Sequence, residues 1–66
     1  MEISVSLVLP TYNASTILHH ELPKIAAWML QQFDSHEIIV IDDGSDDAKK
    51  TAELCVALGC VHIALP

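Results

Sequence analysis

Positive charge is what this 66-residue chain most clearly lacks, because it has no arginine and three lysines against nine acidic residues. Its formal net charge at pH 7 is −6. Proteins that bind nucleic acid contact the phosphates through a basic surface. The charge balance therefore excludes a free-standing nucleic-acid-binding protein.

Long apolar runs are also missing from the sequence. No run approaches the roughly 20 residues that a helix needs to cross a bilayer. The first residues, Met1 to Ser4, lack the basic region with which a signal peptide begins. We therefore expect no membrane span here and a cytoplasmic location, with the cytoplasmic face of a membrane as an alternative for a longer parent protein.

Metal-ligating patterns are scarce. Cys55 and Cys60 have a C-x4-C spacing, a poor match to zinc sites, and we expect both to be reduced core residues. The four histidines fall on different expected elements without the spacing of metal ligands, so we interpret them as structural residues: His19, His20, His36 and His62.

What the sequence does have is the composition of one globular unit, 52% hydrophobic and 18% charged. Apolar runs predict strands near residues 3–9, 37–42 and 60–65, with Pro10 ending the first. A helical pattern lies between each pair of strands. Ser15 is the expected N-cap of the first helix, Pro23 should kink it or mark its start near Glu21, and Ser45 should start the second helix.

This order of elements predicts an α/β fold. With right-handed crossovers, β-α-β-α-β gives three parallel strands, which we expect in the order 3-2-1, as a Rossmann-like three-layer fragment. The packing face of the second helix is expected to hold four residues: Ala48, Ala52, Cys55 and Val56. Trp28, on the first helix, is expected to anchor packing in the core or against another domain.

Two of the expected strands end in polar residues. Residues 38–41 are apolar and lead directly into Asp42, Asp43, Gly44 and Ser45, while the first strand leads into Pro10-Thr11-Tyr12-Asn13. Ligands of open parallel sheets bind at the carboxyl ends of the strands. Because burying acids is costly, a pair of carboxylates at this position indicates a specific role.

Together these segments resemble the start of a family 2 glycosyltransferase with the GT-A fold. Such enzymes open with a strand that ends in Pro-x-Tyr-Asn, and about 30 residues later a strand ends in Asp-Asp-Gly-Ser, the order found here. The resemblance covers about the first quarter of such a domain. It implies that residues 1–66 are the incomplete amino-terminal, nucleotide-binding part of a GT-A domain, within an enzyme that moves a sugar from a nucleotide-diphosphate donor to an acceptor.

The resemblance also assigns roles to individual residues. Asp43 would accept a hydrogen bond from the imino N–H of the nucleotide base, which suits uracil or guanine because a carboxylate is acceptor-only. Asp42 would orient the loop or accept from backbone amides. The alternative is that both acids merely lead a helix and are satisfied by backbone N–H groups.

Other residues would form the surroundings of the base. Tyr12 offers a ring for stacking, although an exposed loop aromatic is the simpler interpretation of that residue alone. Pro10 would fix the loop, Thr11 would bring backbone close to the base, and Ile41 would line the pocket. Family members often have an acid after Tyr-Asn, where this chain has Ala14, so any contact made by that acid is in doubt.

Cofactor and acceptor follow from the resemblance alone. With so few cations, the donor diphosphate would be neutralised by a divalent metal, Mg or Mn, or by residues beyond Pro66. The second acidic motif and the general base of the family would also lie beyond these residues, so the fragment itself should bind no metal and catalyse no transfer. The sequence of residues 37–45 is similar to that of the family members that glycosylate polyprenyl or dolichyl phosphate.

Three other interpretations remain open. A receiver-type signalling domain also clusters acids, but there the pair follows the first strand, whereas here it follows the second. A dinucleotide-binding module would need a Gly-x-Gly-x-x-Gly motif after the first strand, and this sequence has none there. The chain could also be a truncated remnant without activity.

Overall fold

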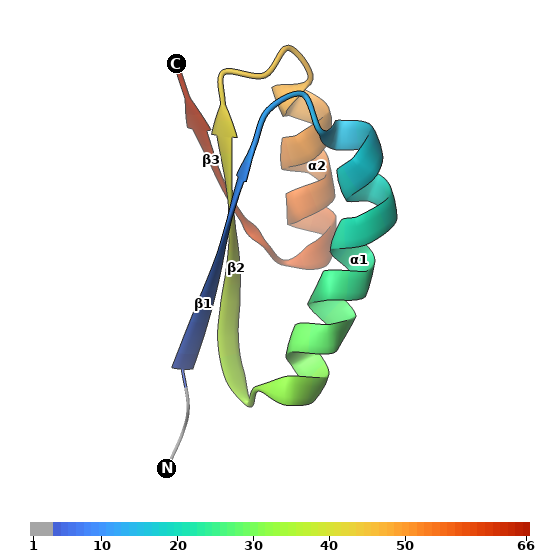
Figure 1. The fold of residues 1–66 in the computed structure, drawn as a ribbon, viewed down its shortest axis with the longest axis vertical. Coiled ribbons are helices and arrows are strands. Elements are labelled where there is room, and N and C mark those ends of the chain that lie inside the picture. The colour runs from blue at the N-terminus through green and yellow to red at the C-terminus, as the bar shows by residue number, and fades with distance from the viewer. Residues whose placement is uncertain (1–3) are drawn as a thin grey trace.

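Strands and helices alternate along the chain in the computed structural model, which describes residues 4–66 (Figure 1). The elements are β1 (Ser4–Thr11), α1 (Ser15–Gln32), β2 (Ser35–Asp43), α2 (Ala48–Leu58) and β3 (Val61–Leu65). This confirms the predicted α/β class and the order of elements. The boundaries of the strands differ by at most two residues from those expected.

The three strands form one parallel sheet with β2 in the centre. β1 pairs with β2 in the register Leu9↔Val40, and β2 pairs with β3 in the register Val40↔His62. The sheet order is β1-β2-β3, which has the same neighbours as the expected 3-2-1 order read from the β3 edge. Each crossover moves the chain over by one strand in the same direction, so the order in the sheet follows the order in the chain.

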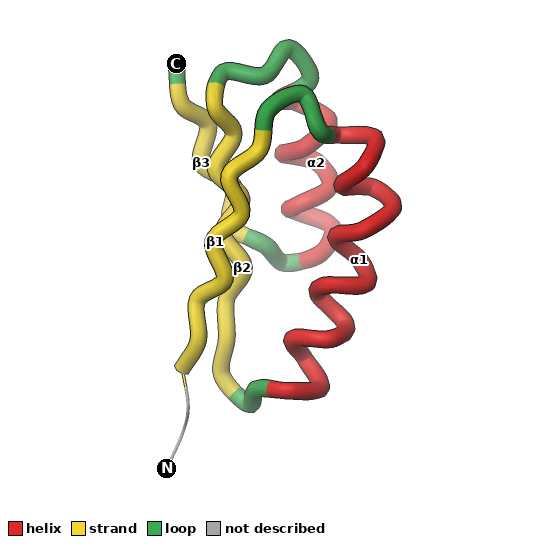
Figure 2. The backbone as a smooth tube through the Cα atoms, in the orientation of Figure 1, coloured by secondary structure: helices red, strands yellow, loops and turns green. Residues whose placement is uncertain are grey.

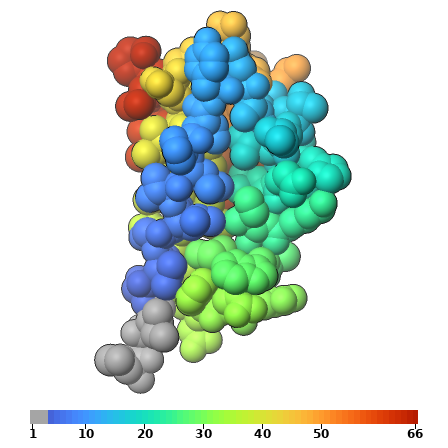
Figure 3. Space-filling view, viewed as in Figure 1, coloured from blue at the N-terminus to red at the C-terminus, as the bar shows by residue number. Residues whose placement is uncertain are grey.

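Both helices lie on one face of the sheet, so the described residues form two layers rather than the three expected (Figures 1 and 2). Two right-handed crossovers that step in the same direction place their helices on the same side. The other face of the sheet is therefore open in residues 4–66. β1 runs along the front edge in the space-filling view, where no other described segment covers it (Figure 3).

The core lies between the helices and the covered face of the sheet. Leu22, Val40 and Cys55 are fully buried, and Met29 is 2% exposed. Cys55 is a free thiol in this core and Cys60 is free and half-buried, and burial raises the pKa of both. Trp28, by contrast, is 54% exposed and packs edge-on against Phe33, so it is not a core residue of this unit.

Proline disturbs the fold less than expected. Pro10 lies inside β1, where the edge position of the strand tolerates a missing N–H. Pro23 lies inside α1, which begins at Ser15, so Pro23 does not mark the start of the helix.

The second helix begins later than expected, and its packing face includes Cys55 as expected but not Val56. α2 begins at Ala48 rather than Ser45, and it buries Thr51, Leu54 and Cys55. Val56, expected on the packing face, is 81% exposed. Gly59 ends the helix in the left-handed conformation at φ 73°, which glycine adopts without strain.

Candidate functional site

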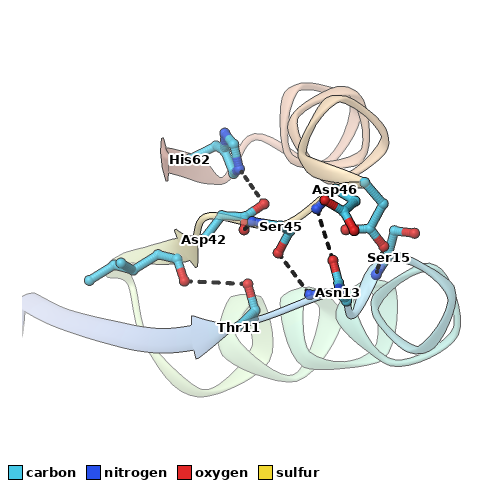
Figure 4. Close-up of polar contacts among 9 residues, drawn as sticks. Thr11, Asn13, Ser15, Asp42, Ser45, Asp46 and His62 are labelled. Atoms are coloured by element: carbon cyan, nitrogen blue, oxygen red, sulfur yellow. Dashed lines mark hydrogen bonds and ion pairs between the residues drawn. The ribbon is translucent and has the colours of Figure 1, made fainter. Parts of the chain in front are cut away.

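Two loops meet where β1 and β2 end, one at residues 12–14 and the other at residues 44–47 (Figure 4). The backbone N–H of Asn13 donates to Ser45 Oγ at 2.7 Å, and the N–H of Asp46 donates to Asn13 Oδ1 at 2.9 Å. Asn13 has φ 48°, a left-handed conformation that asparagine adopts more readily than most residues. The two loops therefore hold each other through Asn13.

A third hydrogen bond joins the second loop to the start of α1. The N–H of Ser15 donates to Asp47 Oδ2 at 3.0 Å. Hydrogen bonding from Ser15 holds the pKa of Asp47 below its ordinary value. Ser15 was expected to be the N-cap of α1, but the cap position is Ala14, whose methyl group cannot accept a hydrogen bond. A carboxylate from the other loop takes that role.

Asp42 points from β2 toward the helices and is 1% exposed. Its Oδ1 accepts the N–H of Ser45 at 3.0 Å. Hydrogen bonding from Ser45 lowers the pKa of Asp42, an effect that burial of the carboxylate partly opposes. This side-chain to backbone bond holds the residues directly after β2 in a non-helical turn, which explains why α2 begins only at Ala48.

His62 of β3 is the neighbour of Asp42 that sequence reasoning missed. Its Nε2 lies 3.6 Å from Asp42 Oδ2, an ion-pair distance too long for a hydrogen bond, and its side chain is 14% exposed (Figure 4). His62 lies two positions before Ala64, the residue of β3 that pairs with Asp42, and therefore on the same face of the strand. Only the register of β3 against β2 reveals this proximity, and no local sequence signal encodes that register.

Asp43 lies on the opposite side of β2, because successive side chains of a strand alternate between faces. It is exposed and lines a pocket of about 350 Å³ together with Pro10, Thr11, Tyr12, Ile41 and Leu65. Five of the six residues proposed from the sequence thus share this pocket, and Asp42 does not line it. Leu65, the sixth lining residue, was not foreseen.

The pocket has an apolar floor and a polar rim. Ile41 and Leu65 come from the ends of β2 and β3, and Pro10 comes from β1. Thr11 uses its hydroxyl to donate to the carbonyl of Ile41 at 3.3 Å, so its side chain ties the two strands together. Tyr12, 64% exposed, leaves its ring accessible at the rim.

A second cavity of about 350 Å³ lies near the other end of the sheet. It is lined mainly by apolar and small residues of α1 and by residues near the end of α2, with His36 and Cys60 as its titratable groups. No carboxylate appears among the described residues that line it. The pocket beside Asp43 is therefore the better candidate, since it combines an apolar wall with a charged acceptor.

Residues 4–66 contain neither a cluster of metal ligands nor a helix that could span a membrane. No group of three or more His, Cys, Asp or Glu side chains in this range is placed to hold a metal ion. The described residues therefore do not fit a metal centre. Neither described helix is both long enough and apolar enough to cross a membrane.

No protein-family model, curated protein or solved structure matches this chain. The candidate site consequently rests on its own geometry and on the motif resemblance.

Proposed function

We propose that this chain is the nucleotide-binding part of a family 2 glycosyltransferase, and that its pocket receives the base of a nucleotide-diphosphate sugar. The observation that carries the proposal is the shared pocket of Pro10, Thr11, Tyr12, Ile41 and Asp43. These residues come from two segments about 30 positions apart. They lie at the carboxyl ends of adjacent parallel strands, where α/β folds bind ligands.

Each part of the pocket suits a nucleobase. The apolar side chains of Ile41 and Leu65 provide a flat wall, and the accessible Tyr12 ring can stack on the base or ribose. The Asp43 carboxylate accepts hydrogen bonds and cannot donate them, so it selects a base that presents an imino N–H. Uracil and guanine meet this requirement. Asp42 supports the loop from the other face of β2 and does not contact the base.

The remaining parts of the enzyme are proposed from the resemblance alone. In that proposal the fold is the Rossmann-like beginning of a GT-A domain, and a divalent Mg or Mn ion would be held by residues outside this chain. The acceptor would be a polyprenyl phosphate, with the enzyme in the cytoplasm or at the cytoplasmic face of a membrane. The 66 residues alone should transfer no sugar.

The receiver-type alternative is less well supported. In a receiver domain the acid pair would follow the first strand, whereas here it lies at the end of β2. Asp42 and Asp43 point to opposite faces of β2, one buried and the other exposed.

Nuclear magnetic resonance titration of the 66-residue chain with nucleoside diphosphates tests the proposal. We expect uridine or guanosine diphosphate to shift the amides of Tyr12 and Asp43. Cytidine and adenosine diphosphate are matched controls, because their bases present a ring nitrogen acceptor where uracil and guanine present an N–H. Equal binding of all four would contradict base recognition by Asp43, and no binding of any would contradict the proposed function.

A further inference from the structure

We propose that Asn13 and Asp47 are positioning residues that hold the two pocket loops in register, so that Tyr12 and Asp43 line one pocket. The nucleotide half of this inference rests on the proposed function, whereas the effect on loop geometry does not. Neither side chain lines the pocket itself. Both lie in the loops that carry or follow pocket residues, Asn13 next to Tyr12 and Asp47 in the loop that follows Asp43.

The hydrogen bonds of Asn13 run in both directions between the loops. Its main-chain N–H donates to Ser45 Oγ at 2.7 Å, and its side-chain Oδ1 accepts from the N–H of Asp46 at 2.9 Å. A sliding movement of either loop would break both bonds. Since residues 32 and 33 positions apart are joined, these bonds fix long-range geometry rather than a local turn.

Asp47 contacts the beginnings of both helices. Its Oδ2 accepts the N–H of Ser15 at 3.0 Å, which places a carboxylate at the positive end of α1. Its main-chain carbonyl accepts from Lys50 and Thr51 in the first turn of α2. One residue therefore fixes where α1 begins relative to α2, and the two pocket loops lead into these two helices.

The opposing interpretation is that these bonds only stabilise the fold. Substitutions can separate the two roles. Asn13→Gly removes the acceptor but allows φ 48° without strain, and Asn13→Asp restores an acceptor oxygen. Asp47→Ala removes the carboxylate that binds Ser15. Asp46→Ala is the matched control, because Asp46 takes part through its backbone N–H, which alanine keeps.

The experiment compares these variants with the unsubstituted chain at a temperature where circular dichroism shows each to be fully folded. The first readout is measured without ligand. It is the chemical shift of the backbone amide of the pocket residue on the loop that does not carry the substitution. We expect Asn13→Gly to move the Asp43 amide and to speed exchange of the Asp46 amide. We expect Asp47→Ala to move the Tyr12 amide, and Asp46→Ala to do neither.

The second readout is affinity for uridine diphosphate. Loss of one hydrogen bond should weaken binding about 2- to 12-fold in Asn13→Gly and Asp47→Ala. Asn13→Asp should recover most of the affinity, and Asp46→Ala should stay within about twofold of the unsubstituted chain. If Asp47→Ala does not fold, Asp47→Asn, which retains an acceptor oxygen, replaces it.

Unchanged cross-loop shifts in folded Asn13→Gly and Asp47→Ala would overturn the positioning role, whatever the affinity. If the unsubstituted chain binds no nucleotide, the proposed function fails, and the ligand-free shifts still decide this inference. Shifts that move in both variants but not in Asp46→Ala support it.

Discussion

The two faces of the sheet are made by alternate residues of the same strands, yet they have opposite character. On the helix-covered face, Val40 is fully buried and Ile38 is 4% exposed. On the open face, Val8 is 48% exposed and Ile63 is 43% exposed, although all four are β-branched residues. The difference comes from which face the helices cover, since the residue types are alike.

The same alternation separates the two adjacent acids at the end of β2. Asp42 belongs to the covered face, where it accepts the Ser45 N–H and faces His62. Asp43 belongs to the open face, where it lines the candidate pocket. A single step along the strand thus changes a carboxylate from a structural group into one available to a ligand.

Adjacent isoleucines on β2 give the most direct test of this difference. Ile38→Ala opens a cavity in the core and should reduce the free energy of unfolding by about 2–5 kcal/mol. Ile39→Ala, on the open face, should cost well under half as much. Urea unfolding followed by circular dichroism measures both, and equal losses would mean that the open face is covered in solution.

The acids should differ in nucleotide affinity rather than in stability alone. Asp43→Asn removes a charge-assisted hydrogen bond to the base, so affinity for nucleoside diphosphate should fall about 10- to 150-fold. Asp42→Asn should weaken binding less, because Asp42 does not line the pocket. Calorimetry with nucleoside diphosphate and with nucleotide-sugar should show equal losses, since the contact is to the base. Unchanged affinity in folded Asp43→Asn would remove Asp43 from base recognition.

Acid should destabilise the protein through two carboxylates, Asp42 on the covered face and Asp47 in its bond to the other loop. We expect this loss of stability to be the smallest of the three effects. The pKa values of Asp42 and Asp47 are lowered in the folded state, so each carboxylate adds stability above its unfolded pKa of about 3.9. That stability is lost as the pH falls through the lower folded values. Unfolding measured from pH 6 to pH 2 should show the loss, and the double variant Asp42→Asn with Asp47→Asn should show a shallower one. An equally steep loss in the double variant would assign acid sensitivity to other groups.

The class of the fold was predictable because its signals are local. Apolar runs predicted three strands, and helical periodicity predicted the two helices between them. Three layers were predicted, and the structure has two. Right-handed crossovers between strands in chain order already imply that both helices lie on the same face of the sheet. Pro10 was expected to end the first strand but lies inside β1. An edge strand tolerates proline, and the position of a strand in the sheet cannot be read from the residue itself.

The pocket could be foreseen in part because its residues flank strand ends that parallel pairing brings together. Pro10, Thr11, Tyr12, Ile41 and Asp43 were assigned roles by the resemblance and line one pocket. Leu65 and His62 were missed, since their place depends on the register of β3. The pairing of Ser15 with Asp47 was also missed, because a cap supplied by another loop leaves no trace in the local sequence.

The open face has a practical consequence for anyone who studies this chain in solution. Fluorescent dyes that bind exposed apolar surface are the usual sign of a molten globule. Here the native state itself presents such a surface, with Val8, Val61, Ile63 and Leu65 each 43–48% exposed. A bright dye signal from this protein would therefore be compatible with complete folding, and a thermal scan that relies on dye would begin near its maximum instead of rising as the chain melts.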